Sequence, residues 1–79
     1  MARRRVRLIF GRDLVTEPVI YELAIKFNIV TNIRRADVTR DDGWVLLEMM
    51  ADSDVLDSGV AYLESRGVRV EPAEGDLVE

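Results

Sequence analysis

The 79-residue chain is predicted to form one α+β domain, in which two helices cover one face of a four-stranded antiparallel sheet. Two observations predict this fold. Apolar residues alternate along four short stretches and recur at helical spacing along two others. The chain is also too short for a second hydrophobic core, so one domain is expected over residues 1–79, with its core at about 3–71.

The first strand is expected at residues 3–10, where apolar side chains alternate with polar ones, as in a strand with one buried face. Its inward-facing residues are Val6, Leu8 and Phe10. A helix follows, because Pro18 suits a first helical turn and either Thr16 or Glu17 can cap it. The apolar stripe of this helix comprises Ile20, Leu23, Ala24 and Phe27.

The second strand is expected at residues 28–39, which are rich in β-branched side chains. One face carries Ile29, Thr31 and Ile33, and the other carries Val30, Asn32, Arg34, Ala36 and Val38. Residues 40–43, which end in Asp-Gly, are typical of a hairpin turn. The third strand, residues 44–50, is apolar on both faces except at Glu48, so it is expected at the centre of the sheet.

The second helix is expected to begin near Asp52, where acidic residues and Ser53 supply a cap and favourable charge. It ends before Gly67, which suits a left-handed C-terminal cap. Its apolar stripe comprises Leu56, Gly59, Val60 and Leu63. A short fourth strand at residues 68–71 is stopped by Pro72, and we expect residues 72–79 to form a flexible acidic tail.

The order strand, helix, strand, strand, helix, strand predicts a ferredoxin-like sandwich with the first and third strands central and the second at an edge. The residues expected to meet the helices are Val6, Leu8, Ile29, Ile33, Val45, Leu47, Val68 and Val70. The opposite face then presents Ile9, Val30, Asn32, Trp44, Leu46, Glu48 and Met50. An apolar face of this kind is expected to be covered by dimerisation, by a ligand, or by both.

The composition argues for a binding module and against an enzyme. Without cysteine or histidine the chain lacks a thiol nucleophile, the commonest general base and the usual zinc ligands. Asp41 and Asp42 are interpreted as turn residues, so no metal site is expected there. We also expect no cofactor and no catalytic residue. Neither a membrane-spanning stretch nor a signal-peptide pattern is found, so we expect a cytoplasmic protein.

Charge is divided unevenly between the two halves of the chain. Residues 1–40 carry nine basic and four acidic side chains, and residues 41–79 carry two basic and eleven acidic ones. Nucleic-acid binding through the basic half is therefore one alternative, with the residues Arg3, Arg4, Arg5 and Arg7. We disfavour it, because the third strand has one aromatic residue, Trp44, and the acid Glu48 where RNA-recognition domains present stacking rings.

Residues 17–24, with Glu17, Pro18 and a Glu-Leu-Ala triplet, and residues 27–38 resemble the NIL domain, a family named after Asn-Ile-Leu on its second strand. Asn32, Ile33 and Arg34 stand at that place, so that Arg34 replaces the leucine. Ala36 stands where the family often has glycine, and residues 67–71 resemble the family's closing strand. The resemblance covers residues 6–71.

The resemblance implies a ferredoxin-like, ACT-like regulatory domain that dimerises. In methionine ABC importers this domain follows the ATPase domain and binds methionine near the dimer interface to inhibit transport. This sequence contains no Walker motif and no ATPase domain, so it is either a free-standing homologue, which we expect, or an excised fragment. The resemblance then implies that it senses an amino acid such as methionine and signals to a transporter or an enzyme. The predicted ligand-binding residues are Asn32, Ile33, Arg34, Trp44 and Glu48, and the predicted dimer interface comprises Val30, Asn32, Trp44, Leu46 and Met50.

The chemistry of these side chains suits an amino acid. Glu48 can receive an ammonium group, and the amide of Asn32 both donates and accepts hydrogen bonds. Arg34 can either pair with a carboxylate or occupy the space that the family's leucine leaves for the ligand. The main alternative is a ligand-free module, in which the second strand and Trp44 form an oligomer or bind a partner protein.

Overall fold

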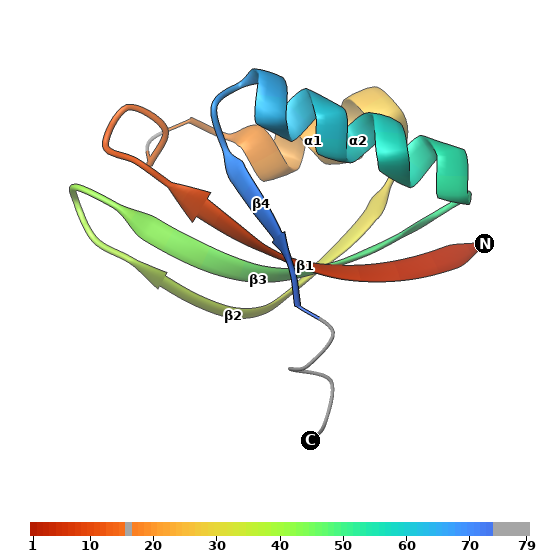
Figure 1. Cartoon of the computed structure of the whole chain (residues 1–79), viewed down its shortest axis with the longest axis horizontal. Coiled ribbons are helices and arrows are strands. Elements are labelled where there is room, and N and C mark those ends of the chain that lie inside the picture. The colour runs from red at the N-terminus through yellow and green to blue at the C-terminus, as the bar shows by residue number, and fades with distance from the viewer. Residues whose placement is uncertain (16, 74–79) are drawn as a thin grey trace.

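The computed structural model describes residues 1–15 and 17–73, which form four strands and two helices in the predicted order. All strand pairs are antiparallel. From one edge of the sheet to the other, the strands are β2 (Val30–Val38), β3 (Gly43–Ala51), β1 (Ala2–Phe10) and β4 (Arg69–Pro72). The predicted ferredoxin-like α+β fold, with the first and third strands central, is confirmed (Figure 1).

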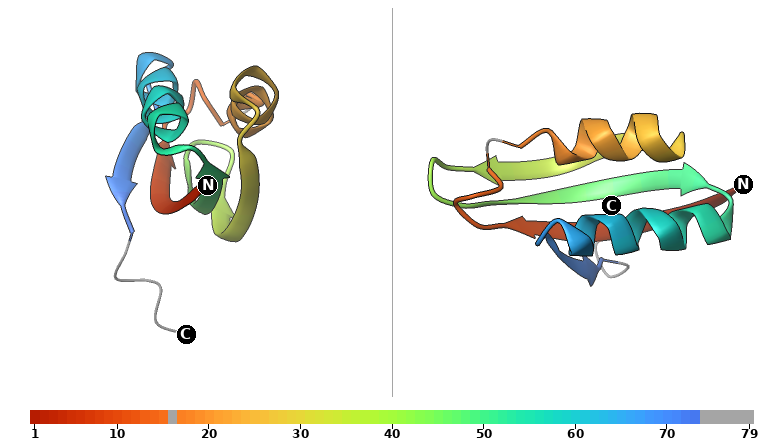
Figure 2. Two further views of the ribbon diagram at one scale, coloured as in Figure 1. Left: turned by 90° about the vertical axis from the view of Figure 1, so that its right-hand side faces the viewer. Right: turned by 90° about the horizontal axis from the view of Figure 1, so that it is seen from above.

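Both helices lie on the same face of the sheet. Figure 2 shows α1 (Val19–Phe27) and α2 (Ser53–Ser65) side by side above the strands. Between them, the rings of Phe27 and Tyr62 lie with their centroids 5.4 Å apart. The core fills the space between helices and sheet, and its most buried large side chains are Leu8, Val19, Leu23, Leu47, Met49, Leu56 and Leu63.

Gly59 allows α2 to approach α1 and the start of the second strand closely. A Cβ atom at this position would lie 2.7 Å from Cδ1 of Ile29 and 3.0 Å from Cδ1 of Leu23. Gly67 has a φ of 93° and follows the end of α2, as its predicted capping role requires. The sequence did not reveal the matching feature of α1: Asn28, predicted to lie in a strand, has a φ of 56° and ends the helix in the left-handed conformation.

Both helices begin where the sequence predicts, but the predicted side-chain caps are not observed among the described residues. The N-cap residues are Pro18 and Asp52, and neither makes a side-chain cap hydrogen bond among the described residues. The Asp54 carboxylate instead accepts a hydrogen bond from the backbone N–H of Val55 at 3.0 Å. Thr16, the other predicted cap, and residues 74–79 of the predicted tail lie outside the described residues.

A β-bulge in β2 changes which side chains face the helices. The register passes from Ile33 opposite Leu47 to Arg35 opposite Leu46, so Arg34 is the extra residue. Beyond this point Ala36 and Val38 lie on the helix-covered side, which corrects the prediction that they share a face with Asn32. Ile33 is 54% exposed, so its predicted place in the core is also wrong.

Among the described residues, neither helix combines the length and the apolar character that crossing a membrane requires.

Candidate functional site

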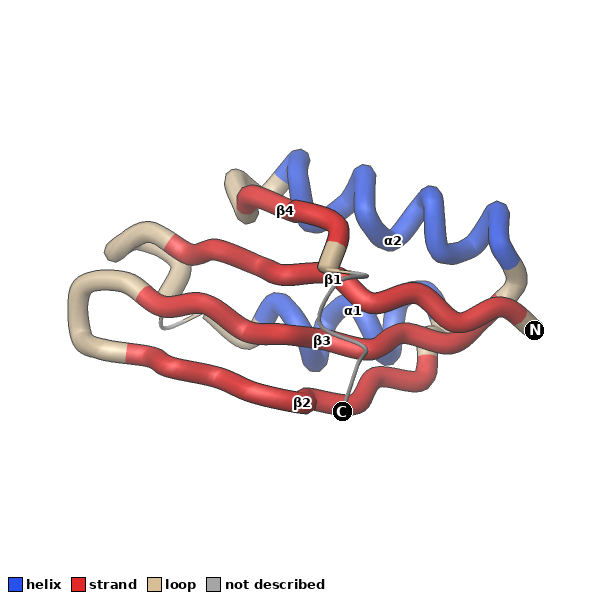
Figure 3. The backbone as a smooth tube through the Cα atoms, turned by 60° about the horizontal axis from the view of Figure 1, so that its bottom comes forward, coloured by secondary structure: helices blue, strands red, loops and turns tan. Residues whose placement is uncertain are grey.

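Figure 3 shows the strands of the sheet side by side, with the face opposite the helices, which we call the open face, turned toward the viewer. The side chains of this face lie in rows across the strands. Strand alternation sends every second residue to this face, and the register aligns these residues between neighbouring strands. In order along the sheet, the rows are Val30, Met50 and Arg3; Asn32, Glu48 and Arg5; Arg35, Leu46 and Arg7; and Asp37, Trp44 and Ile9.

Glu48 is the centre of an ion cluster on this face. It is only 7% exposed and accepts a hydrogen bond from Nε of Arg5 at 3.1 Å. Nε of Arg3 and Nη1 of Arg34 lie 3.7 Å and 3.9 Å from the same carboxylate oxygen, Oε2. One carboxylate on β3 therefore gathers guanidinium groups from β1 and β2.

The charge state of Glu48 follows from this geometry. Burial disfavours the ionised carboxylate, but the hydrogen bond from Arg5 and the positive charges of Arg3, Arg5 and Arg34 outweigh that effect. The pKa of Glu48 consequently lies below its ordinary value. The carboxylate stays ionised at neutral pH and holds the surrounding guanidinium groups in place.

Two predicted ligand-binding residues on β2 lie beside this cluster. Asn32 is directly opposite Glu48 in the register and is exposed. Arg34 is the bulged residue, and its side chain nevertheless reaches Glu48 on the open face. Asn32, Arg34 and Glu48 thus form one site that combines an amide with a guanidinium fork held by a carboxylate.

The other two predicted ligand-binding residues lie apart from this site. Ile33 is opposite Leu47, so it belongs to the helix-covered side of the sheet. Trp44 lies two rows from Glu48, and four residues along a strand span about 13 Å. Trp44 therefore does not share the row of Asn32 and Glu48.

Trp44 instead borders a depression of about 460 Å³ near the β2–β3 turn. The guanidinium carbon of Arg7 lies 5.3 Å from the centroid of the Trp44 ring, a cation–π geometry. The depression is lined by Arg7, Ile9, Asp42, Gly43 and Trp44. It combines an apolar wall with one cation and one carboxylate, and so forms a second place on the open face where a small molecule can bind.

The residues predicted for the dimer interface differ in accessibility. Val30 is 50% exposed, whereas Leu46 is 3% exposed and lies between Arg7 and Arg35 in the register. The remaining members are exposed or half-buried: Asn32, Trp44 and Met50. The expectation that a single chain leaves a bare apolar face in water is wrong at Leu46 in the centre of the sheet, and the arginines beside it have apolar stems that can cover such a residue.

Sequence reasoning did not assign Arg3 and Arg5 to this site. The signal was present, because the alternation that turns Val6 and Leu8 toward the helices sends Arg3, Arg5 and Arg7 to the other face. Their convergence on Glu48 depends on the pairing of β1 with β3, residues more than 40 positions apart in sequence. No local pattern in the chain shows that pairing.

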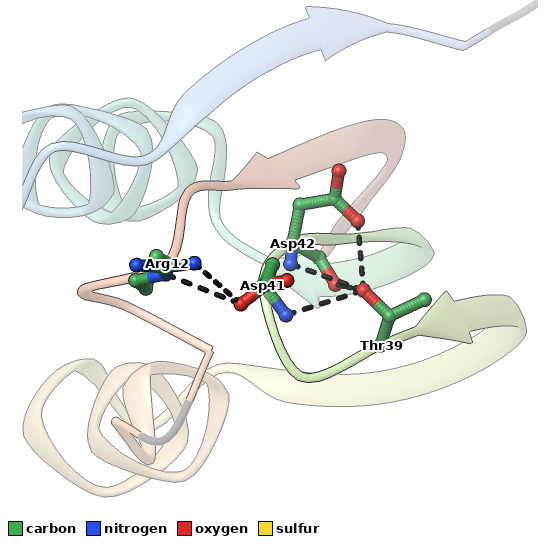
Figure 4. Close-up of polar contacts among 4 residues, drawn as sticks. All are labelled: Arg12, Thr39, Asp41 and Asp42. Atoms are coloured by element: carbon green, nitrogen blue, oxygen red, sulfur yellow. Dashed lines mark hydrogen bonds and ion pairs between the residues drawn. The ribbon is translucent and has the colours of Figure 1, made fainter.

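Asp41 and Asp42 form hydrogen bonds within and beside the β2–β3 turn, as residues of a turn commonly do (Figure 4). Oγ1 of Thr39 donates to Oδ1 of Asp42 at 3.0 Å and accepts from the backbone N–H of that residue. Asp41 accepts a hydrogen bond from Nη2 of Arg12 at 2.9 Å. Within residues 1–15 and 17–73, no group of three or more acidic side chains is arranged to hold a metal ion.

A smaller cavity of about 230 Å³ lies on the helix-covered side, at the start of α1. Its lining is mainly apolar and includes Phe10, Leu14, Val15, Val19, Val38 and Val45. It lacks the cluster of charged side chains found on the open face, so the open face is the stronger candidate for binding a polar ligand.

Comparison with known proteins agrees with this fold. The family model of the NIL domain matches residues 4–72. The methionine import ATP-binding protein MetN of Coxiella burnetii is 34% identical over 70 residues, which cover 84% of this chain and 20% of that protein. The chain thus spans about a fifth of the length of this curated relative.

A solved structure shares the architecture. The C-terminal domain of an ABC transporter ATP-binding protein from Enterococcus faecalis superimposes with a TM-score of 0.78, at 15% identity, covering 90% of this chain and 83% of that chain. At this level of identity the likeness establishes the fold.

Proposed function

Since the chain belongs to the NIL domain family, we propose that it is a regulatory module that binds an amino acid such as methionine at a homodimer interface. The relative from Coxiella burnetii is a methionine import ATP-binding protein, and this supports methionine as the candidate ligand. The module performs no chemistry of its own. Its output is the change in dimer geometry that a cytoplasmic partner, a transporter subunit or an enzyme, detects.

The observation that carries this proposal is the ion cluster beside an exposed edge strand. Nη1 of Arg34 lies 3.9 Å from Oε2 of Glu48 at the β2 edge, and we propose that a ligand carboxylate pairs with this guanidinium group. The Asn32 amide lies in the same row as Glu48 and can bind the ligand's ammonium or carboxylate group. Glu48 accepts a hydrogen bond from Arg5 and so positions arginines in this proposal, and its predicted contact with the ligand's ammonium group stays a prediction.

The edge strand also supports the proposed dimer. β2 lies at the edge of the sheet and carries Val30, Ile33 and Val38, each at least half exposed. A long edge strand with apolar side chains is a template for pairing with another chain. A second copy paired along β2 would place two Asn32 side chains and two Arg34 side chains near the interface, so ligand binding and dimer geometry would be coupled.

Calorimetric titration with methionine and the other amino acids tests this function. We expect methionine to bind the wild-type chain, and Asn32→Ala to weaken binding about tenfold or more by removing one hydrogen-bonding group. Thr31→Ala is the matched control, because Thr31 is the neighbouring residue on β2 and faces the other side. Absence of heat with every amino acid would remove the sensing function, and circular dichroism shows whether Asn32→Ala still folds.

A second candidate, a ligand-free oligomerisation module, is favoured by the same exposed apolar residues of β2. The two functions differ in what controls assembly. Sedimentation equilibrium with and without methionine distinguishes them, because a sensor changes its dimer constant with ligand and a ligand-free module does not. Trp44→Ala adds a second comparison: loss of the dimer with unchanged methionine binding would assign Trp44 to assembly alone.

A further inference from the structure

The charge asymmetry of the sequence becomes an asymmetry between the two sides of the fold. Arg3, Arg5 and Arg7 alternate along β1 and all lie on the open face. Residues 53–65, which form α2 on the other side, contain three acidic side chains and no basic one. The arginines of β1 and the acidic side chains of α2 therefore lie on opposite sides of the sheet, and Figure 2 shows α2 on the side away from the open face.

The edge strands extend the basic surface. The β2 bulge directs Arg34 toward Glu48 and places Arg35 opposite Leu46, and on β4 Arg69 lies opposite Ile9. Together with the arginines of β1, six guanidinium groups occupy the open face. Among the described residues, its acidic members are Glu48, Asp37, Glu71 and, at the β2–β3 turn, Asp42. Six cations against four carboxylates leave an excess of two positive charges on this surface, which we call the arginine face.

We propose that the arginine face is a docking surface for an acidic segment of a partner protein. Charge complementarity supports an acidic partner segment. Arginines of this face already contact carboxylates of the chain itself, and a partner's carboxylates would be bound in the same way. Arg5 donates to Glu48, and Nη2 of Arg69 lies 3.0 Å from a carboxylate oxygen of Glu71. The guanidinium groups at the periphery are accessible, since the side chains of Arg3 and Arg69 are 63% and 73% exposed. Carboxylates of a partner would extend this network across the sheet.

The same observations favour a peptide over a nucleic acid. Within the described residues, Trp44 is the one aromatic residue on the open face, and Arg7 already lies over its ring. Single-stranded nucleic acids bind through several open stacking platforms, which this surface does not offer among those residues. The chain also carries a net charge of −4, which opposes the approach of a long polyanion more than that of a short acidic segment.

The test is fluorescence anisotropy of a labelled oligoglutamate peptide titrated with the full chain, compared with a labelled oligothymidylate of equal charge. We expect the peptide to bind more tightly than the oligonucleotide, and its affinity to fall as salt rises from about 0.01 M to 0.3 M, where the screening length shortens. Equal or tighter binding of the oligonucleotide would overturn the proposal in favour of nucleic acid. Absence of binding to either would overturn it altogether.

Charge-reversal variants locate the surface. Arg35→Glu is expected to weaken peptide binding about tenfold, and Arg35→Glu/Arg69→Glu further, because both residues lie on the arginine face. Lys26→Glu is the matched control: it changes the net charge equally but lies on α1, and we expect less than about a twofold effect. Equal losses in Arg35→Glu and Lys26→Glu would overturn the proposal, since they would reflect net charge alone.

A further variant accounts for the chain's own acidic residues. Residues 74–79 contain Glu74, Asp76 and Glu79, which carry the same chemistry as the probe. Neutralising all three as Glu74→Gln/Asp76→Asn/Glu79→Gln is expected to leave peptide binding intact or to strengthen it. Loss of binding in this variant would contradict docking on the arginine face. Because the probe contains no free amino acid, this experiment is independent of the proposed methionine binding.

Discussion

The two faces of the sheet are built from the same four strands but on opposite physical principles. The helix-covered face is closed by apolar side chains such as Leu8, Leu47 and Leu56, which are fully buried. The open face buries its central residues almost as deeply, with Leu46 at 3% and Glu48 at 7% exposure, and both have arginines as neighbours in the register. Low exposure therefore does not identify the core in this protein. The two faces differ in the groups that cover them, which are packed apolar side chains on the helix-covered face and flexible arginine side chains on the open face.

The comparison predicts its largest effect at two neighbouring leucines of β3. Leu47 faces the helices and Leu46 faces the arginines. We expect Leu47→Ala to lower the free energy of unfolding by about 3–5 kcal/mol, and Leu46→Ala by about 2 kcal/mol or less, because flexible arginine stems can collapse into the space that a core cannot fill. Urea denaturation measures both. Equal losses would show that the open face is packed as rigidly as the core.

The helix-covered face was predictable because its signal is local. Alternation in residues 3–10 and helical spacing at Leu56, Gly59 and Leu63 each identify an inward side without reference to the rest of the chain. The errors on this side arose at β2, where the bulge at Arg34 exchanged the faces of the residues that follow. A bulge depends on pairing with β3, and no residue in the segment requires it.

The candidate site was predictable only in part, for a different reason. The family motif identified Asn32 and Arg34, and alternation identified Glu48, and the structure brings these three together. The sequence could not show that Arg3 and Arg5 converge on Glu48, because this contact joins strands that are distant in the chain. The open face was predicted to be exposed and apolar because arginines were treated as polar residues only. Their methylene stems can cover neighbouring apolar side chains such as Leu46.

Acid titration probes the open face through the charge of Glu48. Its pKa is lowered, so the stability it contributes is fully present above the glutamate pKa of about 4.3 in an unfolded chain and is lost as pH falls through the lower folded value. We expect Glu48→Gln to destabilise the protein at neutral pH and to flatten the loss of stability on acidification. Urea midpoints measured from neutral to acidic pH test both expectations.

Glu22 provides the matched carboxylate on the helix side. Its pKa is also lowered, by the hydrogen bonds from Tyr62 and Arg66 and by the charge of Arg66 and Lys26. Glu22→Gln should have the same sign of effect but a smaller size, because Glu22 lies beside fewer guanidinium groups and is more exposed than Glu48. A larger effect at Glu22 would show that the helix network, and not the arginine cluster, controls acid sensitivity.

The smallest difference is expected between two cation–π contacts, one on each side of the molecule. Arg7 lies 5.3 Å from the ring centroid of Trp44 on the open face, and Lys26 lies 5.1 Å from that of Tyr62 on the helix side. Arg7→Ala and Lys26→Ala should each lower the free energy of unfolding by no more than about 1 kcal/mol. The loss in Arg7→Ala should be the larger, since the stem of Arg7 also adjoins Leu46 in the register and indole attracts cations more strongly than phenol.

Trp44 is the single tryptophan, so its fluorescence reports which contact is lost: the emission should change in Arg7→Ala and not in Lys26→Ala. An unchanged emission spectrum in Arg7→Ala would mean that the guanidinium group does not cover the ring in solution, and the open face would then present one open stacking platform.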